Sequence, residues 1–454
     1  MTKNRSTTTS RNTKVSSDVL QLPENRGSAV DAGRSVAQNT LYPRWLREAQ
    51  DAARMILRSP DFLNQFLAAV KKQGLVGEEK AALVVLIVIV SRLLKRPLNL
   101  MLKGRSASGK NFVVRKVLSL VPRTAVIEIT SSSARAWNYA EDAFCHRLVL
   151  LQERNEASGA VHPMRLLISE GKLVRIVTVR ENGRWVTKRF VSRGPIASIS
   201  TTTKDRLEPD DESRSLSLWT DESEAQTARI VHAYGYERRL STFERRAWRE
   251  IHNLLQQRSR HEILLPRWLR RFADHVYTKD LKVRRYYPAF IEACRTVALI
   301  RSFQKGLSSG DGVTVDFIDV AITASIMGEV SAESIHKSEG QVAETRKVVE
   351  QISRSKNGAP VGRKDLVAAL RISKDQAFRM LSNADGAGAI FRANKNEKSN
   401  RKLYLPTPRP RFVPDPAELF EMLTDNDVPN RVEWINPLTG KATVYTRRRF
   451  AGKR

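Results

Sequence analysis

The sequence contains little cysteine and little histidine. Its 454 residues include two cysteines, Cys145 and Cys294, which lie far apart, and seven histidines scattered along the chain. Two distant cysteines provide neither a disulfide framework nor the paired spacing of a zinc site. The composition therefore argues against a disulfide-stapled domain and against a structural metal module.

Long apolar runs are also missing. The most apolar stretch, residues 81–90, has about half the length that a membrane-spanning helix needs, and charged residues flank it. We interpret it as a buried core helix. Residues 1–14 are basic and rich in hydroxyl side chains, but they lack the apolar centre of a secretory signal. We therefore expect a cytoplasmic protein without a membrane partner.

Acidic residues are far fewer than basic ones. Lysine and arginine number 78, aspartate and glutamate number 48, and the formal net charge is +30. An excess this large predicts a polyanionic partner, which is usually nucleic acid. A membrane surface is the less favoured alternative, because the basic residues are spread over the whole chain. DNA is the expected partner, although charge alone does not separate DNA from RNA.

Residues 98–121 contain the strongest motif. An apolar run predicts a short buried strand, which is followed by the segment GRSASGKN and then by the apolar spacing of a helix. Gly104, Gly109 and Lys110 match the phosphate-binding spacing G-x-x-x-x-G-K-[ST]. Asn111 stands where the motif has a hydroxyl side chain.

The residue types in this motif suit phosphate binding. Glycines allow successive backbone N–H groups, including those around Ser108, to turn towards a phosphate, and the start of the following helix adds its positive dipole end. Lys110 would supply a point charge to the outer phosphates. A surface loop with a chance Gly-Lys pair is disfavoured, because the motif lies between a strand and a helix. The sequence predicts a nucleotide site at Gly104, Ser108, Gly109, Lys110 and Asn111.

Apolar runs alternate with helical segments before and after the motif. This alternation predicts an α/β fold with a parallel sheet covered by helices. The predicted strands are 98–102, 124–130, 146–153 and 195–203.

An insertion at 164–191 interrupts this alternation. It combines a helical piece with two alternating segments about Asn182-Gly183, which is a strong hairpin signal. Arg180, Arg184 and Lys188, with the nearby Arg189, would place several cations against a nucleic-acid backbone. A hairpin merely protected from aggregation by charge is the alternative. We favour DNA binding because the whole chain is basic.

The strand at 146–153 ends in Gln152-Glu153. A phosphate loop needs an acid at the end of a neighbouring strand to hold Mg²⁺ and to activate water, and Glu153 is our choice, with Glu156 a weaker candidate. An exposed strand-end glutamate is the alternative for Glu153. Gln152 and Asn111 replace groups that usually help to hold the metal, and amide oxygens bind it more weakly than carboxylates. Nucleotide binding should survive these replacements, whereas fast hydrolysis is less secure.

Several polar residues are weaker candidates for the same site. Thr202, at the end of the strand at 195–203, could reach the γ-phosphate or the attacking water, although threonine is also common in strands. Arg214 could reach a neighbouring subunit's γ-phosphate or lie on the surface. Arg284 or Arg285, at the start of an apolar helix, could contact phosphate or simply be solvated. Finally, the turn at Val76-Gly77 could lie near the nucleotide base or could be an ordinary helix–helix turn.

The segment at 341–405 has the pattern of a winged helix-turn-helix. Predicted helices at 348–353, 363–370 and 374–384 precede a strand, a basic loop and a strand. Ala377, Met380 and Leu381 would pack inward in the third helix. A protein–protein adaptor is the alternative to DNA binding. The expected DNA-binding residues are Lys374, Gln376 and Arg379 on the third helix and Lys395, Lys398 and Arg401 on the wing.

Composition and periodicity together divide the chain into six ranges. The first is rich in Ser, Thr, Asn and Arg, which predicts disorder, and the last begins with a Pro-rich spacer. The ranges are a disordered tail at 1–40, a helical collar at 41–97, the α/β core at 98–220, a helical region at 221–340, the winged helix-turn-helix at 341–405, and a Pro-rich linker with a further hairpin and basic tail at 406–454.

The order of these features resembles the AAA+ ATPases of the helicase branch that carries a hairpin before the sensor-1 strand. The minichromosome-maintenance helicases and the replicative helicases of viruses and plasmids belong to this branch. More narrowly, the sequence is similar to helicase- and primase-associated ATPases found in phages and integrative elements. The resemblance covers residues 45–340. It implies ATP and Mg²⁺ as ligands, a lid at 221–340, and a ring, often a hexamer, whose hairpins grip DNA.

The same resemblance implies roles for single residues. Lys110 and Asn111 would belong to Walker A, Glu153 would be the Walker B base, Thr202 would be sensor 1, Arg214 would be the trans-acting finger, and Arg284 or Arg285 would be sensor 2. An ATP-dependent DNA helicase or translocase of a phage or mobile element is the expected function. The alternative is a DNA-binding initiator, loader or regulator that uses ATP as a switch and hydrolyses it slowly.

Overall fold

The structure is a computed structural model, and its described residues divide at Arg47. Residues 43–47 are the described part of the first unit and contain the start of helix α1 (Arg44–Arg58); all other elements follow in the second unit. The structure describes residues 43–130, 133–152, 161–204, 213–235, 239–276, 278, 281–307, 312–335, 340–386, 389–394, 401–407 and 413–447.

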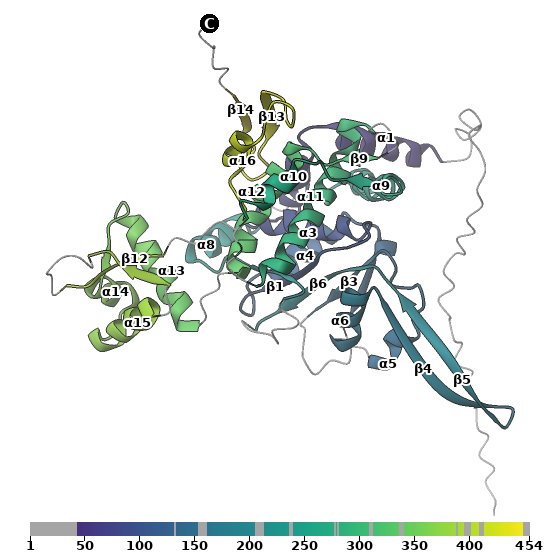
Figure 1. The fold of residues 1–454 in the computed structure, drawn as a ribbon, viewed down its shortest axis with the longest axis horizontal. Coiled ribbons are helices and arrows are strands. Elements are labelled where there is room, and N and C mark those ends of the chain that lie inside the picture. Colours follow the sequence, from purple (N-terminus) through teal and green to yellow (C-terminus); the bar gives the residue numbers. More distant parts are fainter. Residues whose placement is uncertain are drawn as a thin grey trace, which may run out of the picture. The chain divides into compact units, whose positions relative to one another are not determined.

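A five-stranded parallel sheet lies at the centre of the fold (Figure 1). Its order is β2-β3-β6-β1-β7, and every neighbouring pair is parallel. The mixed α/β fold with a parallel sheet is therefore confirmed. The carboxyl ends of all five strands lie along one edge of the sheet. The strands are β1 (Asn99–Lys103), β2 (Val126–Ile129), β3 (Arg147–Leu151), β6 (Ile196–Thr202) and β7 (Leu216–Trp219).

Helix α3 (Glu79–Ser91) is the most deeply buried helix of the described chain, and it packs against the sheet strand β6 and several helices. Every residue from Ala81 to Ser91 is buried. A helix that is apolar on all sides must be surrounded by protein, so the prediction of a buried core helix is confirmed. In the described part of the chain, no helix has both the length and the apolarity needed to cross a membrane. Helix α2 (Phe62–Lys72) precedes α3.

The insertion in the core forms a long antiparallel hairpin of β4 (Lys172–Glu181) and β5 (Arg184–Arg193), visible as a two-stranded ribbon in Figure 1. Asn182 and Gly183 have φ values of 50° and 79°, which is the left-handed geometry of a two-residue type I′ turn. The predicted hairpin is confirmed, with slightly wider limits than 164–191. Helices α5 (Ala134–Asn138) and α6 (Val161–Glu170) contact the hairpin. The other elements of the core are α4 (Lys110–Leu118) and the short 3₁₀ turn η2 (Arg123–Ala125).

The region after β7 is mainly helical, as its periodicity predicts. It adds one parallel pair of two-residue strands, Ile263–Leu264 with Val313–Thr314. Helices α11 and α12 pack along each other. The elements are α8 (Glu224–Ala233), α9 (Thr242–Arg258), β8 (Ile263–Leu264), α10 (Leu269–Ala273), α11 (Val283–Lys305), β9 (Val313–Thr314) and α12 (Phe317–Ile335).

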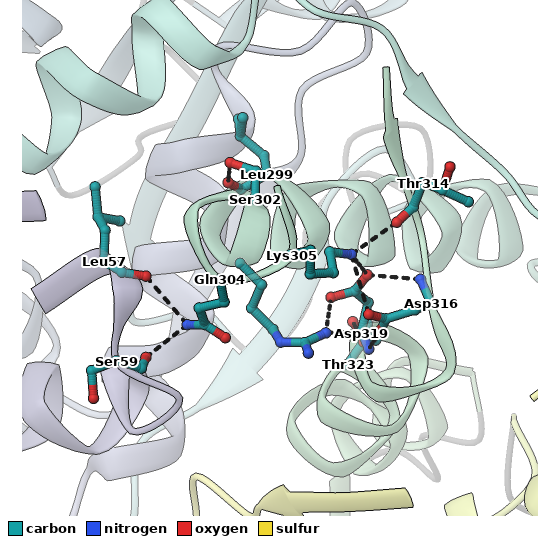
Figure 2. A network of polar contacts seen from close by, with 11 residues as sticks. Leu57, Ser59, Leu299, Ser302, Gln304, Lys305, Thr314, Asp316, Asp319 and Thr323 are labelled. Carbon is teal, nitrogen blue, oxygen red and sulfur yellow. Dashed lines mark hydrogen bonds and ion pairs between the residues drawn. The ribbon is translucent and has the colours of Figure 1, made fainter. Parts of the chain in front are cut away.

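A charged cluster joins the end of α11 to the start of α12 (Figure 2). Arg301 Nη1 donates to Asp316 Oδ1 at 2.8 Å and to Asp319 Oδ1 at 2.5 Å, and Asp319 is fully buried. Lys305 also pairs with Asp319 and donates to the Thr314 carbonyl at 2.8 Å. The backbone N–H groups of Asp316 and Asp319 each donate to the other residue's carboxylate at 2.9 Å. This reciprocal arrangement satisfies free N–H groups at the start of α12.

Residues 340–407 form a small group of helices and strands with its own hydrophobic core. Strands β10, β12 and β11 pair in that order as an antiparallel sheet. Ala377, Met380 and Leu381 are buried in this core, as the helical spacing predicts. The elements are α13 (Gly340–Ser355), β10 (Val361–Gly362), α14 (Arg363–Leu370), α15 (Lys374–Gly386), β11 (Ile390–Arg392) and β12 (Leu403–Pro406).

The last described segment is more ordered than a linker with a tail. Helix α16 (Pro416–Met422) and the hairpin of β13 (Arg431–Ile435) and β14 (Ala442–Thr446) contribute buried residues to the main core. The Phe317 ring lies 5.4 Å from the ring of Phe420 and 5.9 Å from that of Tyr445. The expected hairpin is present, and aromatic packing on α12 makes 413–447 a folded part of the protein.

Candidate functional site

The phosphate-binding motif forms a tight loop between β1 and α4 at the carboxyl edge of the sheet. Gly109 has a φ of 86°, which favours glycine, and it immediately precedes the helix. Gly104 has no room for a side chain, because a Cβ atom there would lie 2.4 Å from Thr220 Oγ1 and 2.6 Å from Ser108 Oγ. The loop and the helix start thus have the geometry that suits an anion.

The Lys110 side chain lies folded back over this loop. Its Nζ donates to the carbonyl oxygens of Gly104 and Arg105, both at 2.6 Å, and lies 3.4 Å from Ser108 Oγ. The residue is buried, with 9% of its surface exposed. These contacts hold a positive charge at the loop. Asn111 occupies the next position of α4 and is partly buried.

The segment that follows β7 contacts the loop, which the sequence did not predict. Thr220 Oγ1 donates to Ser108 Oγ at 2.9 Å, and the Thr220 N–H donates to the Lys103 carbonyl at 3.1 Å. Glu222 accepts the Arg105 N–H at 2.5 Å. Strand β7 lies beside β1, so residues distant in sequence become neighbours at the sheet edge.

The same segment holds the turn between α2 and α3. Gln226 is buried, and its Nε2 donates to the Val76 carbonyl at 2.6 Å. A Cβ atom on Gly77 would lie 2.0 Å from Gln226 Oε1. Glu78 accepts the Asp221 N–H at 2.8 Å. The collar turn and the phosphate loop therefore contact one common segment, residues 220–226, although a base-binding role for Val76 and Gly77 stays a prediction.

Glu78 gives this junction a pH dependence. Burial raises the pKa of its carboxyl from 4.5 to about 7, and the nearby Asp221 and Glu79 carboxylates act in the same direction, against Arg229 and the Asp221 N–H. An acid whose pKa is raised by folding stabilises the folded state only while it is protonated. This stabilisation is therefore lost as the pH rises from 4.5 to 7.

Glu78→Gln should remove this loss, because glutamine stays neutral and can still accept the Asp221 N–H. We expect the melting temperature of the variant to rise relative to the wild type between pH 4.5 and 7. Glu79→Gln is the matched control. Burial raises the pKa of Glu79, but the lowering effects, chiefly the hydrogen bond and charge of Lys71, outweigh burial, and the net pKa lies below 4.5. The Glu79→Gln variant should therefore lose stability at neutral pH. If the melting temperatures of the wild type and Glu78→Gln depend on pH in the same way, the raised pKa of Glu78 is contradicted.

The ends of β6 and β3 follow the phosphate loop along the carboxyl edge, with β6 beside β1 and β3 beyond β6. Thr202 is buried, pairs with Lys103 in the sheet, and accepts the Lys204 N–H at 3.1 Å. Gln152 follows β3, and its amide contacts Arg115 and Glu128 at 3.5 Å each. Glu153 and Glu156 lie outside the described residues, so their expected contacts with water and Mg²⁺ stay predictions.

The predicted arginines lie at the other edge of the sheet. Arg214 precedes the amino end of β7 and donates to Ser169 Oγ of α6 at 2.8 Å, while Arg285 contacts Ser213. Arg284 is exposed beside it at the start of α11. Because β7 and β1 are parallel, these contacts lie opposite the phosphate loop. The structure thus departs from the expected lid contact, since it does not bring these arginines to this chain's own loop.

The hairpin cations are divided between two faces. Arg180 pairs with Trp185 and Ile176 pairs with Arg189, and residues opposite each other in a ladder share a face. We call this the Trp185 face; 71% of Trp185 and 65% of Ile176 are exposed. The predicted single cluster is corrected, because strand alternation places Arg184 and Lys188 on the reverse face.

The reverse face, which we call the Lys188 face, is partly occupied. Lys188 forms an ion pair with Glu181. Nearer the base of the hairpin, the Phe190 ring packs edge-on against Tyr139 with centroids 4.7 Å apart, and Arg175 lies 5.5 Å from the same ring. The Trp185 face is the more accessible one, and no motif in the sequence points to its exposed tryptophan.

The predicted DNA-binding residues of the small C-terminal group are partly described. Lys374, Gln376 and Arg379 are exposed on α15, and Arg401 is exposed before β12. Lys395 and Lys398 lie outside the described residues. Phe378, 47% exposed, lies between these positions on α15, with Lys402 Nζ 5.9 Å from its ring centroid.

Comparisons with known proteins add little to this site. No protein-family model matches the sequence, and no curated protein matches it. Among solved structures, the chain is similar to a candidate ATPase from Cytophaga hutchinsonii, with 13% identity, a TM-score of 0.37, and coverage of 66% of this chain and 95% of the other. This likeness is too remote to assign an activity or a residue role to the chain.

Proposed function

We propose that this chain is an ATP-dependent DNA helicase or translocase of the AAA+ class, acting in replication of a phage or mobile element. One observation carries the proposal: β1, a glycine-bounded loop and α4 hold the Lys110 ammonium 2.6 Å from two loop carbonyls at the carboxyl edge of a parallel sheet. A triphosphate would replace these carbonyls as the partner of the charge. Residues 221–340 would serve as the lid.

Different residues of the site would contact different parts of ATP and its metal ion. The backbone around Gly104, Ser108 and Gly109 would surround the phosphates, and Lys110 would neutralise their charge. Asn111 and Glu153 would hold Mg²⁺, whose role is to neutralise charge on the outer phosphates. Thr202 would orient the attacking water from the adjoining strand end.

The far edge of the sheet supports action in a ring. Arg214 and Arg285 are held by Ser169 and Ser213, away from the loop of their own chain. An arginine so placed is suited to the γ-phosphate of a neighbouring subunit, and such fingers raise hydrolysis rates by orders of magnitude. A hexamer is the expected assembly.

The hairpin would grip DNA with its Trp185 face, and the winged helix at 341–405 would add contacts through Lys374, Gln376, Arg379, Lys398 and Arg401. Arg180 lies 6.0 Å from the Trp185 ring, so a cation and an exposed aromatic ring occur together. Aromatic rings stack on unpaired bases, and arginines bind phosphates. A single strand is therefore the DNA form that this face suits.

Two charge-matched double variants test the grip. Arg180→Ala/Arg189→Ala on the Trp185 face should weaken DNA binding and DNA-stimulated ATP hydrolysis, and should reduce the salt dependence of binding by about 1.4 in log–log slope. Arg184→Ala/Lys188→Ala removes the same charge from the other face and should have a smaller effect. Fluorescence anisotropy with a labelled single strand and phosphate release measure the two quantities. Equal losses in both variants would contradict the assignment to one face.

Two residues favour a second candidate, an initiator, loader or regulator that ATP switches without fast turnover. Asn111 has an amide where the motif usually has a hydroxyl. Gln152 has an amide where a carboxylate is usual, and this amide contacts Arg115 and Glu128. Weak metal binding would slow hydrolysis while leaving ATP binding intact. If ATP assembles the protein on DNA with negligible phosphate release, this candidate replaces the motor.

A further inference from the structure

A groove lies in the helical region, and no residue of the phosphate loop or the hairpin lines it. It is formed by the connection between β8 and α10, by α10, and by α11, with a volume of about 1010 Å³. We call it the Arg270 groove. Its wall includes Leu265, Arg267, Arg270, Arg271, Tyr287 and Ile291.

The charge of the groove is of one sign. Its lining residues include three arginines and no acidic residue. Arg271 is held by Asp427 through two hydrogen bonds of 2.8 and 3.3 Å, and it stays 53% exposed. Among the described residues, no hydrogen bond or ion pair to an acid is seen for Arg267 or Arg270, and both are exposed. The groove thus presents guanidinium groups to any anion that enters it.

An aromatic column supports one wall. The Tyr287 ring stacks on Phe272 with centroids 6.4 Å apart and planes at 20°, and Phe272 stacks on Phe290 at 5.6 Å and 13°. Phe272 and Phe290 are buried, whereas Tyr287 is half-buried and lines the groove. A ring already fixed by packing loses little freedom when a ligand binds.

We infer that the Arg270 groove binds a single strand of nucleic acid. Cationic groups that follow a backbone, together with an aromatic platform and apolar walls for the bases, are the usual features of such sites. An acidic protein segment would match the arginines but would make no use of the aromatic platform. The inference goes beyond the proposed function, because it assigns a binding surface separate from the hairpin and the winged helix and does not depend on ATP.

The test is binding of a fluorescein-labelled oligothymidylate to the full chain without nucleotide. Arg267→Ala/Arg270→Ala should weaken binding and reduce the log–log salt slope by about 1.4. Arg239→Ala/Arg260→Ala removes two exposed arginines outside the groove and should bind like the wild type. Tyr287→Leu should weaken binding by roughly tenfold, whereas Tyr287→Phe keeps the ring and should not.

The outcomes separate the alternatives. The inference stands if the groove variants lose affinity and Arg239→Ala/Arg260→Ala does not, while the melting temperatures of all variants match the wild type. It is overturned if both arginine double variants behave alike, or if a polyglutamate peptide binds in an Arg270-dependent manner while the oligonucleotide does not. Absence of ATP hydrolysis would overturn the proposed motor but leave the inference about the groove unaffected. Loss of binding in the hairpin variants, with unchanged binding in the groove variants, would overturn the inference and leave the proposed motor unaffected.

Discussion

Lys110→Ala is expected to lower ATP hydrolysis by about 100- to 1,000-fold, the usual cost of removing one preorganised group that stabilises the transition state. The physical reason is the position of its ammonium, which lies within 2.6 Å of two loop carbonyls and is shielded from water. In such a site a charge acts more strongly on phosphate than it would in bulk water. ATP affinity should fall as well, because the charge contacts the ground state too.

The measurement is phosphate release with and without DNA, together with binding of a fluorescent ATP analogue. Lys95→Ala removes an equal charge from an exposed position and should leave both quantities unchanged. Lys110→Arg keeps the charge but not the compact shape, so it should restore little activity. Wild-type hydrolysis in Lys110→Ala would show that the loop is not the site of the reaction.

Asp319→Ala is expected to produce the largest loss of stability, about 3–5 kcal/mol of unfolding free energy, or roughly 10 °C in melting temperature. Asp319 is fully buried and pairs with both Arg301 and Lys305 (Figure 2). Removing it leaves two cations in the protein interior with one remaining carboxylate, Asp316, which is costly because buried charge is poorly solvated.

Thermal and urea unfolding measure this loss. Asp51→Ala is the control, since Asp51 is 72% exposed in its pair with Arg54, and such pairs contribute less than about 1 kcal/mol. Combining Asp319→Leu with Lys305→Met restores charge balance and should recover part of the loss. A change under about 1 kcal/mol for Asp319→Ala would show that the cluster contributes little to stability.

The sequence predicted those parts of the fold whose signals are local. The four apolar runs became β1, β2, β3 and β6, and Asn182-Gly183 became the hairpin turn. The all-round apolar run at 81–90 became a buried helix. In each case, burial or turn geometry depends on residue types within a few positions of one another.

Contacts between distant segments could not be predicted in this way. Glu222 and Gln226 join the phosphate loop and the collar turn only because β7 pairs with β1. Aromatic packing by Phe420 turned an apparent linker into part of the core. Trp185 was overlooked because an alternating strand pattern does not reveal which face stays uncovered. The placement of Arg214 and Arg285 likewise follows from strand direction, which no local motif encodes.

The face of the hairpin on which a side chain lies depends on whether an insertion has an odd or an even number of residues. Its two-residue turn fixes which residues face each other, and side chains alternate along each strand. A single residue inserted near the turn in β5 would transfer Arg189 to the opposite side without changing composition or charge. Insertion of two residues would restore the original side, so the effect of an insertion on nucleic-acid binding should depend on parity.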